Sequence, residues 1–340
     1  MTNNENKVMK KTFKEKLSDF AAAWRDPSTA RLRNQKVLMF FAILLRMLLL
    51  TGLCFIIILP LIQKFSFALR APQDISNPRV MWIPETFSLI NIRLSWELMS
   101  YVDSFFGSLV LASISTFIQI IATAVAGYSF ARLKFPGNNI IFFIVLFTLV
   151  VPNETLNIAR RLYFSNNGFF GIMLIGKWFA MYIMSAFGMG IRSAIFIYIF
   201  RQFFRGVPIE LEESAQIDGA GVIRTFWSVM LPNARGAIVT VGLFAFVWQW
   251  NDYYFAQVFR YTTVLGTKLF GLAENTSTVI GGNMAYWNRL GIDVDIIRSS
   301  QFLGLLSNTM ALLMMLPLLI AYFFVQKLFV ESIERTGIVG

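Results

Sequence analysis

The chain has 340 residues, of which 56% are hydrophobic and only 14% are charged, and 35 of them are phenylalanine. Soluble domains rarely have this composition, and several apolar runs are long enough to cross a bilayer, so a soluble globular fold is excluded. The net charge of +11 would suggest a nucleic-acid partner in a soluble protein, but in a membrane protein it indicates basic cytoplasmic flanks, and no nucleic-acid partner is expected.

A basic segment, residues 1–46, opens the chain with ten lysines and arginines against four acidic residues. It lacks the short apolar core and small-residue cleavage site of a signal peptide, so we expect it to belong to the mature protein. Its sequence suits either a basic amphipathic helix on the inner membrane face or a solvated tail. The first span is expected over residues 47–65, because a helix that began at Val37 would place Arg46 about 13 Å deep in the membrane.

Later apolar runs predict five further spans. The stretch of residues 169–200 would be about 48 Å long as a single helix, too long for a ~30 Å hydrocarbon core. We therefore expect a partial or interfacial segment that ends near Met181, followed by one span from about Ser185 to Phe204. The chain is thus predicted to be an all-α polytopic membrane protein with about six transmembrane helices. The remaining predicted spans lie near residues 105–130, 140–152, 236–257 and 302–326.

The distribution of lysine and arginine predicts which loops face the cytoplasm. The N-terminal segment is basic, the short loop ARLKFPG after the second span carries two positive charges and no acid, and the next inner loop contains four arginines. We therefore expect residues 205–234 to be cytoplasmic, and the loops of residues 66–104 and 259–300 to be external. All three belong to a predicted transmembrane domain of residues 47–340.

The segment ELEESAQIDGAGVIRTFWSVMLP, residues 210–232, is polar, although long apolar runs lie on both sides of it. Pro208 suits the first turn of a helix, and the three glutamates that follow lie at the positive end of the helix dipole. This helix should end near Asp218 and Gly219, because glycine permits a left-handed turn.

A second helix is expected from about Gly221, with Val222, Phe226 and Met230 on one face and Trp227 beside them. The turn between the two helices is lined by small residues, which let a helix–turn element lie deep in a groove of another protein. Phe226 or Trp227 could then act as an aromatic anchor. The alternative is a linker that packs on its own helical bundle, and the local pattern leaves both open.

This segment resembles the EAA loop of the permease subunits of binding-protein-dependent ABC importers, in ESAQIDGA, in the preceding VPIELE and in the closing LP. In that family the cytoplasmic loop is a coupling helix that docks into a groove on the ATPase subunit. Ser214 departs from the usual alanine but keeps the side chain small. Carried over by position, the ATPase-coupling residues are Glu213, Ser214, Ala215, Asp218, Gly219, Ala220, Leu231 and Pro232, with Phe226 as a candidate anchor.

Four other segments resemble the carbohydrate (maltose-type) branch of this family, namely IPETFSLINI, GYSFARLKFPG, WQWNDYYFAQ and the C-terminal VQKLFVESIERTGIVG, which lacks the usual lysine before the final glycine. Together the matches cover roughly residues 46–340. The resemblance implies the type I importer permease fold, in a prokaryotic cytoplasmic membrane. It also implies a second permease subunit, an ABC ATPase dimer and an extracellular or periplasmic solute-binding protein as partners, besides membrane lipid.

The stretch GIMLIGKW, residues 171–178, nearly spells a phosphate-binding loop. However, Trp178 stands where a serine or threonine would hold magnesium, and no strand-to-helix context is expected around it. Since the sequence offers no other candidate loop, we expect Mg-ATP to be bound and hydrolysed by a separate ATPase subunit. The chain itself is predicted to be no enzyme and to carry no cofactor or metal.

The outer part of the fifth predicted span is rich in aromatic and polar side chains. Aromatic faces stack on the C–H faces of sugars while amides and carboxylates bond to their hydroxyl groups, so the segment suits a sugar path. The alternative is an aromatic belt at the membrane interface with a solvated carboxylate, and the sequence favours neither. The candidate substrate-path residues are Trp248, Trp250, Asn251, Asp252 and Tyr253, with Gln249 lying among them.

Two other classes of function are less compatible with the sequence. A secondary transporter often shows an inverted repeat and buried titratable coupling groups, and neither is evident. A membrane enzyme would need a convergent catalytic set, yet histidine is absent and the one cysteine, Cys54, lies in an apolar run. The favoured hypothesis is an importer permease for a carbohydrate. The alternatives are an importer permease for a non-sugar solute and, after it, a secondary transporter.

Overall fold

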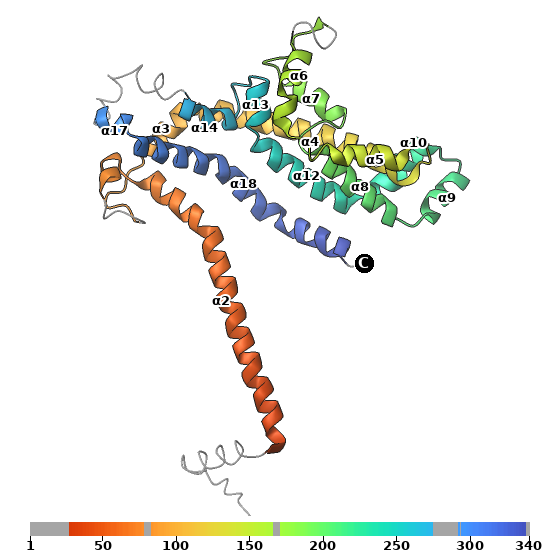
Figure 1. Cartoon of the computed structure of the whole chain (residues 1–340), viewed down its shortest axis with the longest axis horizontal. Coiled ribbons are helices and arrows are strands. Elements are labelled where there is room, and N and C mark those ends of the chain that lie inside the picture. The colour runs from red at the N-terminus through yellow and green to blue at the C-terminus, as the bar shows by residue number, and fades with distance from the viewer. Residues whose placement is uncertain (1–26, 78–82, 166–170, 275–291, 293, 338–340) are drawn as a thin grey trace, which may run out of the picture. The chain divides into compact units, whose positions relative to one another are not determined.

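The computed structural model describes residues 27–77, 83–165, 171–274, 292 and 294–337. The chain forms two compact units, residues 1–63 and residues 64–340. Within the described residues, all regular secondary structure is helical, apart from one isolated β-bridge between Arg70 and Phe87 (Figure 1). The predicted all-α class is confirmed.

The first long helix, α2 (Pro27–Leu69), begins well before the predicted start of the first span at residue 47. Its apolar stretch, Gln35–Leu69, has 35 residues and is therefore about 52 Å long, which exceeds a ~30 Å hydrocarbon core. Most large apolar side chains between residues 37 and 58 are exposed, as expected of a helix that faces lipid. The helix thus extends beyond the predicted span of residues 47–65 at both ends, and because it is longer than the hydrocarbon core it can carry Arg46 without placing it at the middle of the bilayer.

Three helices form the centre of the second unit (Figure 1). The long helix α4 (Tyr101–Arg132), which confirms the predicted second span, packs against both α8 (Ser193–Gly206) and α12 (Arg235–Trp250). A glycine on α4 makes the contact with α8 possible, because a Cβ atom on Gly127 would lie only 2.5 Å from Cβ of Phe200. Small residues at such crossings let membrane helices approach closely.

The apolar stretch of residues 169–200 is broken as predicted. It contains α7 (Phe179–Ala186) and the start of α8, joined by a turn in which Gly188 has φ +68°. The second helix begins at Ser193 rather than at the predicted Ser185. The turn is fixed by Gln119 of α4, whose Nε2 donates to the Ile191 carbonyl and to the Ser193 hydroxyl oxygen, both at 2.8 Å.

Three of the described helices are long and apolar enough to span a membrane, and a fourth results if the bent pair Val222–Asn233 and Arg235–Trp250 counts as one span. The predicted third and fourth spans contain shorter helices, α5 (Asn138–Phe147) and α8, of 10 and 14 residues. After α5 the chain continues through the short helices η2 (Asn153–Leu156) and α6 (Asn157–Tyr163). The last predicted span is confirmed within α18 (Ser300–Gly337).

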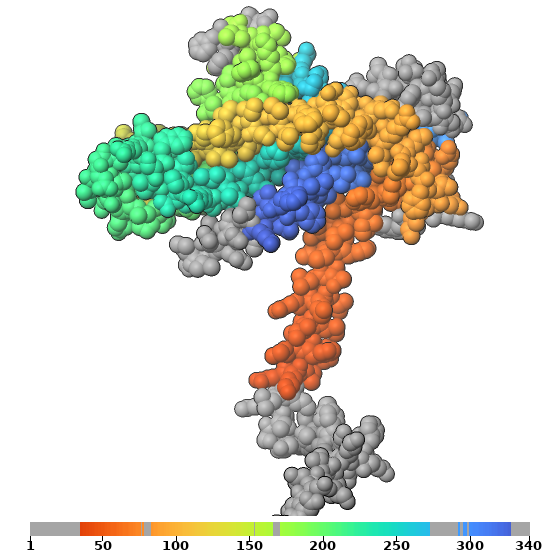
Figure 2. Space-filling model, turned by 180° about the vertical axis from the view of Figure 1, so that it is seen from behind, coloured from red at the N-terminus to blue at the C-terminus, as the bar shows by residue number. Residues whose placement is uncertain are grey.

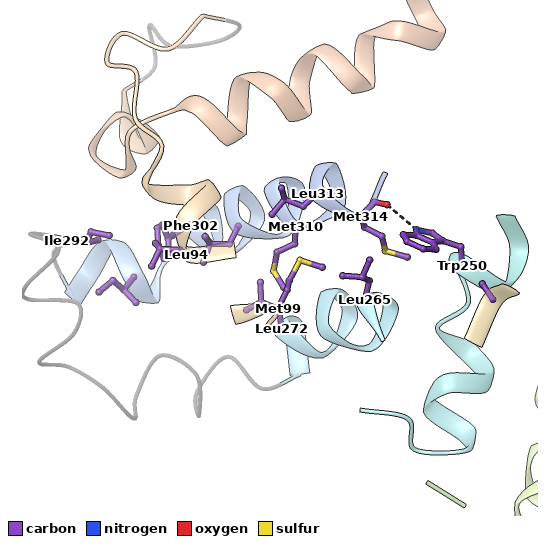
Figure 3. Close-up of a cluster of buried hydrophobic side chains, with 13 residues drawn as sticks. Leu94, Met99, Trp250, Leu265, Leu272, Ile292, Phe302, Met310, Leu313 and Met314 are labelled. Atoms are coloured by element: carbon purple, nitrogen blue, oxygen red, sulfur yellow. Dashed lines mark hydrogen bonds between the residues drawn. The ribbon is translucent and has the colours of Figure 1, made fainter. Parts of the chain in front are cut away.

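The two loops predicted to be external contain helices that share one hydrophobic core with α4, α12 and α18 (Figure 3). Leu94, Leu265 and Phe302 lie in this core and come from three different parts of the chain. The described parts of these loops are therefore packed structure. Their helices are η1 (Pro72–Ser76), α3 (Ile90–Leu98), α14 (Leu265–Glu274) and α17 (Val294–Arg298).

Candidate functional site

The polar segment of residues 210–232 forms a helix, a tight turn and a second helical stretch, as predicted. The first helix, α9 (Glu210–Ile217), ends in a left-handed turn at Gly219, whose φ is +82°. The Ala220 amide donates to the Ala215 carbonyl at 2.9 Å, and the Gly219 amide donates to the Gln216 carbonyl at 3.0 Å. This pair of bonds is a Schellman cap, which uses the left-handed conformation that glycine adopts without strain.

A buried carboxylate, Glu212, fixes α9 to the end of α4. The residue is 6% exposed, and its Oε1 accepts a 2.7 Å hydrogen bond from the Tyr128 hydroxyl. The Arg132 Nε lies 3.4 Å from the other carboxylate oxygen, and an Nη2–H of the same guanidinium donates to the Val207 carbonyl just before α9. Two residues of α4 thus hold both α9 and the chain just before it.

Two exposed isoleucines flank the turn. Ile217 is 86% exposed and Ile223 is 77% exposed, although both are large apolar residues and the charge pattern predicts that this segment is cytoplasmic. The predicted anchor Phe226 instead is 4% exposed and packs on Tyr128 and Phe204 within the chain's own core. Of the two aromatic candidates, only Trp227, at 47% exposed, is accessible at the surface.

The second helical stretch leads into α12 at a sharp angle. It consists of α10 (Val222–Thr225), the π-helical turn η4 (Phe226–Met230) and α11 (Leu231–Asn233), and its axis makes an angle of 79° with that of α12. Figure 2 shows this segment, in green and teal, at one end of the unit of residues 64–340, next to the yellow end of α4. Phe226 and Met230 lie in the same hydrophobic core as Ala237 and Val241 of α12, so the bend between the two helical stretches is packed.

The remaining residues carried over from the EAA resemblance lie on or beside the exposed turn at Gly219. The turn itself is open, since a Cβ atom on Gly219 would meet nothing within 4 Å. The other residues fall into two groups: Glu213, Ser214, Asp218 and Pro232 are exposed, and Ala215, Ala220 and Leu231 are half-buried. The structure therefore brings the predicted coupling residues together, with Phe226 as the one that points inward.

The candidate substrate-path residues are divided by the structure. Trp250 is 3% exposed, lies in the core of Figure 3, and donates from Nε1 to the Met314 carbonyl at 3.1 Å. Trp248 is half-buried, with its ring stacked on Phe196 and the Arg192 guanidinium 4.6 Å from its centroid. Both indoles are thus engaged within the chain, a packing role that neither sequence alternative included.

The polar members of this stretch also have local partners. Asp252 caps α13 (Tyr254–Val258), since its carboxylate accepts hydrogen bonds from the amides of Phe255 at 3.2 Å and Ala256 at 3.0 Å. Tyr253 stacks on Phe270 with ring centroids 4.4 Å apart. Asn251 is exposed, and its amide donates to the Val247 carbonyl at 2.8 Å.

The neighbouring Gln249 differs from all of these. It is 4% exposed, and neither atom of its side-chain amide has a hydrogen-bond partner in the described part of the chain. A buried amide without a partner is costly, so such a group commonly marks a place where a bound molecule or another chain completes the bonding. Sequence reasoning included Gln249 in the segment but had no means to single it out.

The chain has recognisable relatives. It is 31% identical over 213 residues to the osmoprotective compounds uptake permease protein GgtD of Synechocystis, a match that covers 61% of this chain and 69% of GgtD. It is 34% identical over 180 residues to the alpha-glucoside transport system permease protein AglG of Rhizobium meliloti. That match covers 52% of this chain and 46% of AglG, so it spans less than half the length of that relative. No protein-family model matches the chain.

The chain belongs to the permease subunits of ABC transporters.

The fold of this permease agrees with that assignment. A chain in the crystal structure of a bacterial ABC transporter involved in the import of the acidic polysaccharide alginate superposes with a TM-score of 0.60, covering 86% of this chain and 97% of that one. Their sequence identity is 21%, so the likeness concerns the fold. The predicted importer permease fold and multi-pass membrane location are confirmed.

Proposed function

We propose that this permease forms part of the translocation path for a carbohydrate, and that residues 205–234 couple it to a separate ABC ATPase dimer. The observation that carries the coupling is the combination of an open turn at Gly219, exposed Ile217 and Ile223 on either side of it, and a buried anchor at Glu212. Exposed apolar residues on a rigidly held polar element are typical of a docking surface.

The proposed partners follow from the family. A second permease subunit would complete the path, and an extracellular or periplasmic binding protein would deliver the substrate. An alpha-glucoside is named for AglG, osmoprotective compounds for GgtD, and sn-glycerol-3-phosphate for UgpE of Yersinia pestis, which is 27% identical over 183 residues. A carbohydrate fits the first of these names and the two amide side chains after residue 248, the unpartnered Gln249 and the exposed Asn251, and a non-sugar solute is the alternative.

The proposal assigns Mg-ATP to the partner and no cofactor to this chain. The loop-like stretch of residues 171–178 supports this, because the Gly176 amide donates to the Phe259 carbonyl at 2.7 Å instead of being free for a phosphate. Lys177 in the same stretch is exposed and lies before α7, whereas a phosphate-binding loop joins a strand to a helix. In the described residues, no group of three acidic or cysteine side chains is arranged to hold a metal ion.

Co-purification tests the proposed function. The permease is expressed with a tagged ATPase subunit, the second permease and the binding protein, and the complex is isolated through the tag. We expect the permease to be retained, and ATP hydrolysis by the complex to rise when the binding protein carries its sugar. Hydrolysis stimulated only by a non-sugar solute would select the alternative substrate class. A permease that transports solute without any bound ATPase would contradict the proposal.

A further inference from the structure

We propose that a basic pocket at the inner end of α4 binds the headgroup of an anionic phospholipid. The pocket has a volume of about 610 Å³ and lies between the end of α4, the loop of residues 133–137, the start of α5, and α8. Arg132, Lys134, Arg201 and Arg205 line it, and no acidic residue is among its lining residues.

In the described part of the chain, three of the four cations in this pocket are not paired with a carboxylate. Arg132 is paired with Glu212, but in the described residues neither Lys134, Arg201 nor Arg205 forms an ion pair. Arg201 and Arg205 are four residues apart on α8, a spacing at which like charges repel. An anion between them would relieve this repulsion, so the charges in the pocket favour a negatively charged occupant.

The backbone favours the same kind of occupant. The helix α5 begins in the pocket with Asn138 and Asn139, after Gly137, and it has no side-chain cap and no acidic residue in its first turn. Its positive dipole end therefore lies at the same pocket as the cations, although the Asn138 amide itself donates to the Phe135 carbonyl at 3.3 Å. Helix N-termini with this arrangement bind phosphate groups well.

The surface beside the pocket identifies a lipid as the source of that phosphate. From the pocket α5 continues as an apolar helix with Ile140 69% exposed, Phe143 67% exposed and Ile144 57% exposed. A headgroup in the pocket would thus have its acyl chains against exposed isoleucine and phenylalanine side chains. Basic pockets between helices on the cytoplasmic side are known as headgroup sites.

The position of Arg201 shows that the pocket is built into the helical packing. Its guanidinium lies 4.0 Å from the ring centroid of Phe142 on α5, and its Nε donates to the Phe130 carbonyl at the end of α4 at 3.4 Å. The residue thus touches all three helices around the pocket. Its placement at the inner leaflet rests on the proposed function, which sets residues 205–234 in the cytoplasm.

Native mass spectrometry of the full chain from nanodiscs tests the site. The discs contain equal amounts of phosphatidylglycerol and phosphatidylcholine, and the ratio of the two lipids retained on the protein is measured. We expect a clear preference for phosphatidylglycerol. Lys134→Gln and Arg205→Gln should each lower the ratio of retained phosphatidylglycerol to phosphatidylcholine about fivefold, since each cation near the surface contributes about that factor. Both side chains are exposed, so folding should be kept. Arg235→Gln, at an exposed cation outside the pocket, should leave the ratio unchanged.

Three results would overturn the lipid site. These are a wild-type chain without a phosphatidylglycerol preference, an equal loss in the Arg235→Gln control, and displacement of the lipid by millimolar inorganic phosphate. A preference that disappears when the ATPase is added would instead show that the pocket is a protein contact. Because pull-down by the ATPase is scored separately, a chain that binds the ATPase but shows no lipid preference would refute this site alone.

Discussion

Glu212→Ala should loosen the coupling segment much more than Glu213→Ala, although the two residues are neighbours on α9. Removal of the Glu212 carboxylate leaves the Tyr128 hydroxyl without its acceptor and the Arg132 guanidinium without its ion-pair partner, in a place where the three residues are 5% to 13% exposed. A buried donor without a partner costs about 1–3 kcal/mol. Arg132 keeps its bond to the Val207 carbonyl, which limits the effect, so we expect the free energy of unfolding to fall by about 2–4 kcal/mol in total.

The control and a conservative variant make this estimate specific. Glu213 is exposed, so Glu213→Ala should change stability by less than about 0.5 kcal/mol. Glu212→Gln can still accept the Tyr128 hydrogen bond and should lie between the two. The assay is the thermal unfolding midpoint of the purified permease, since Glu213 is itself a predicted coupling residue and its loss would affect ATPase retention directly. A double-mutant cycle with Tyr128→Phe should give a coupling energy above about 0.5 kcal/mol. Equal effects of Glu212→Ala and Glu213→Ala on the unfolding midpoint would refute the proposed anchor.

Three further predictions concern the turn, the aromatic segment and the loop-like stretch. Gly219→Leu should lower the free energy of unfolding by about 1–2 kcal/mol and weaken ATPase retention, whereas Gly221→Leu should have a smaller effect, because of these two glycines only Gly219 has a left-handed backbone. Equal losses of the ATPase in a pull-down of the two variants would contradict this. Trp250→Ala should lower the unfolding midpoint, because it removes a buried core side chain and about 3–5 kcal/mol of stability, whereas Asn251→Ala should lower only sugar uptake. An unchanged midpoint in Trp250→Ala would refute its place in the core. Lys177→Ala should leave nucleotide binding by the assembled complex unchanged, as photolabelling with an ATP analogue can check.

The features that follow from local chemistry could be predicted from the sequence. The end of α9 is one, since Asp218 followed by Gly219 favours a left-handed cap whatever surrounds it. The break in the apolar stretch of residues 169–200 was also predicted, from its length, although α2 shows that an apolar stretch of 35 residues can form one helix. Such constraints act within a few residues or through chain length alone.

The features that depend on distant partners could not be predicted. Which of Glu212 and Glu213 is buried depends on the rotation of α9 against Tyr128, a residue 84 positions earlier in the chain. From the sequence Trp250 was interpreted as lining a sugar path or as part of an aromatic belt, because its partner, the Met314 carbonyl, lies 64 positions away and leaves no local signal. Likewise, no local pattern distinguished the buried Phe226 from the exposed residues around the turn.

The central claim is that the turn between Ile217 and Ile223 docks on an ATPase from the cytoplasmic side. Site-directed cross-linking in the assembled complex tests it most directly, with Ile223→Cys in a Cys54→Ser background that removes the native cysteine. The matched control is Thr262→Cys, an exposed position in a loop predicted to be external. We predict a cross-link from Ile223→Cys to the ATPase and none from Thr262→Cys. The opposite pattern, or labelling of Ile223→Cys by an impermeant reagent added outside intact cells, would contradict the account.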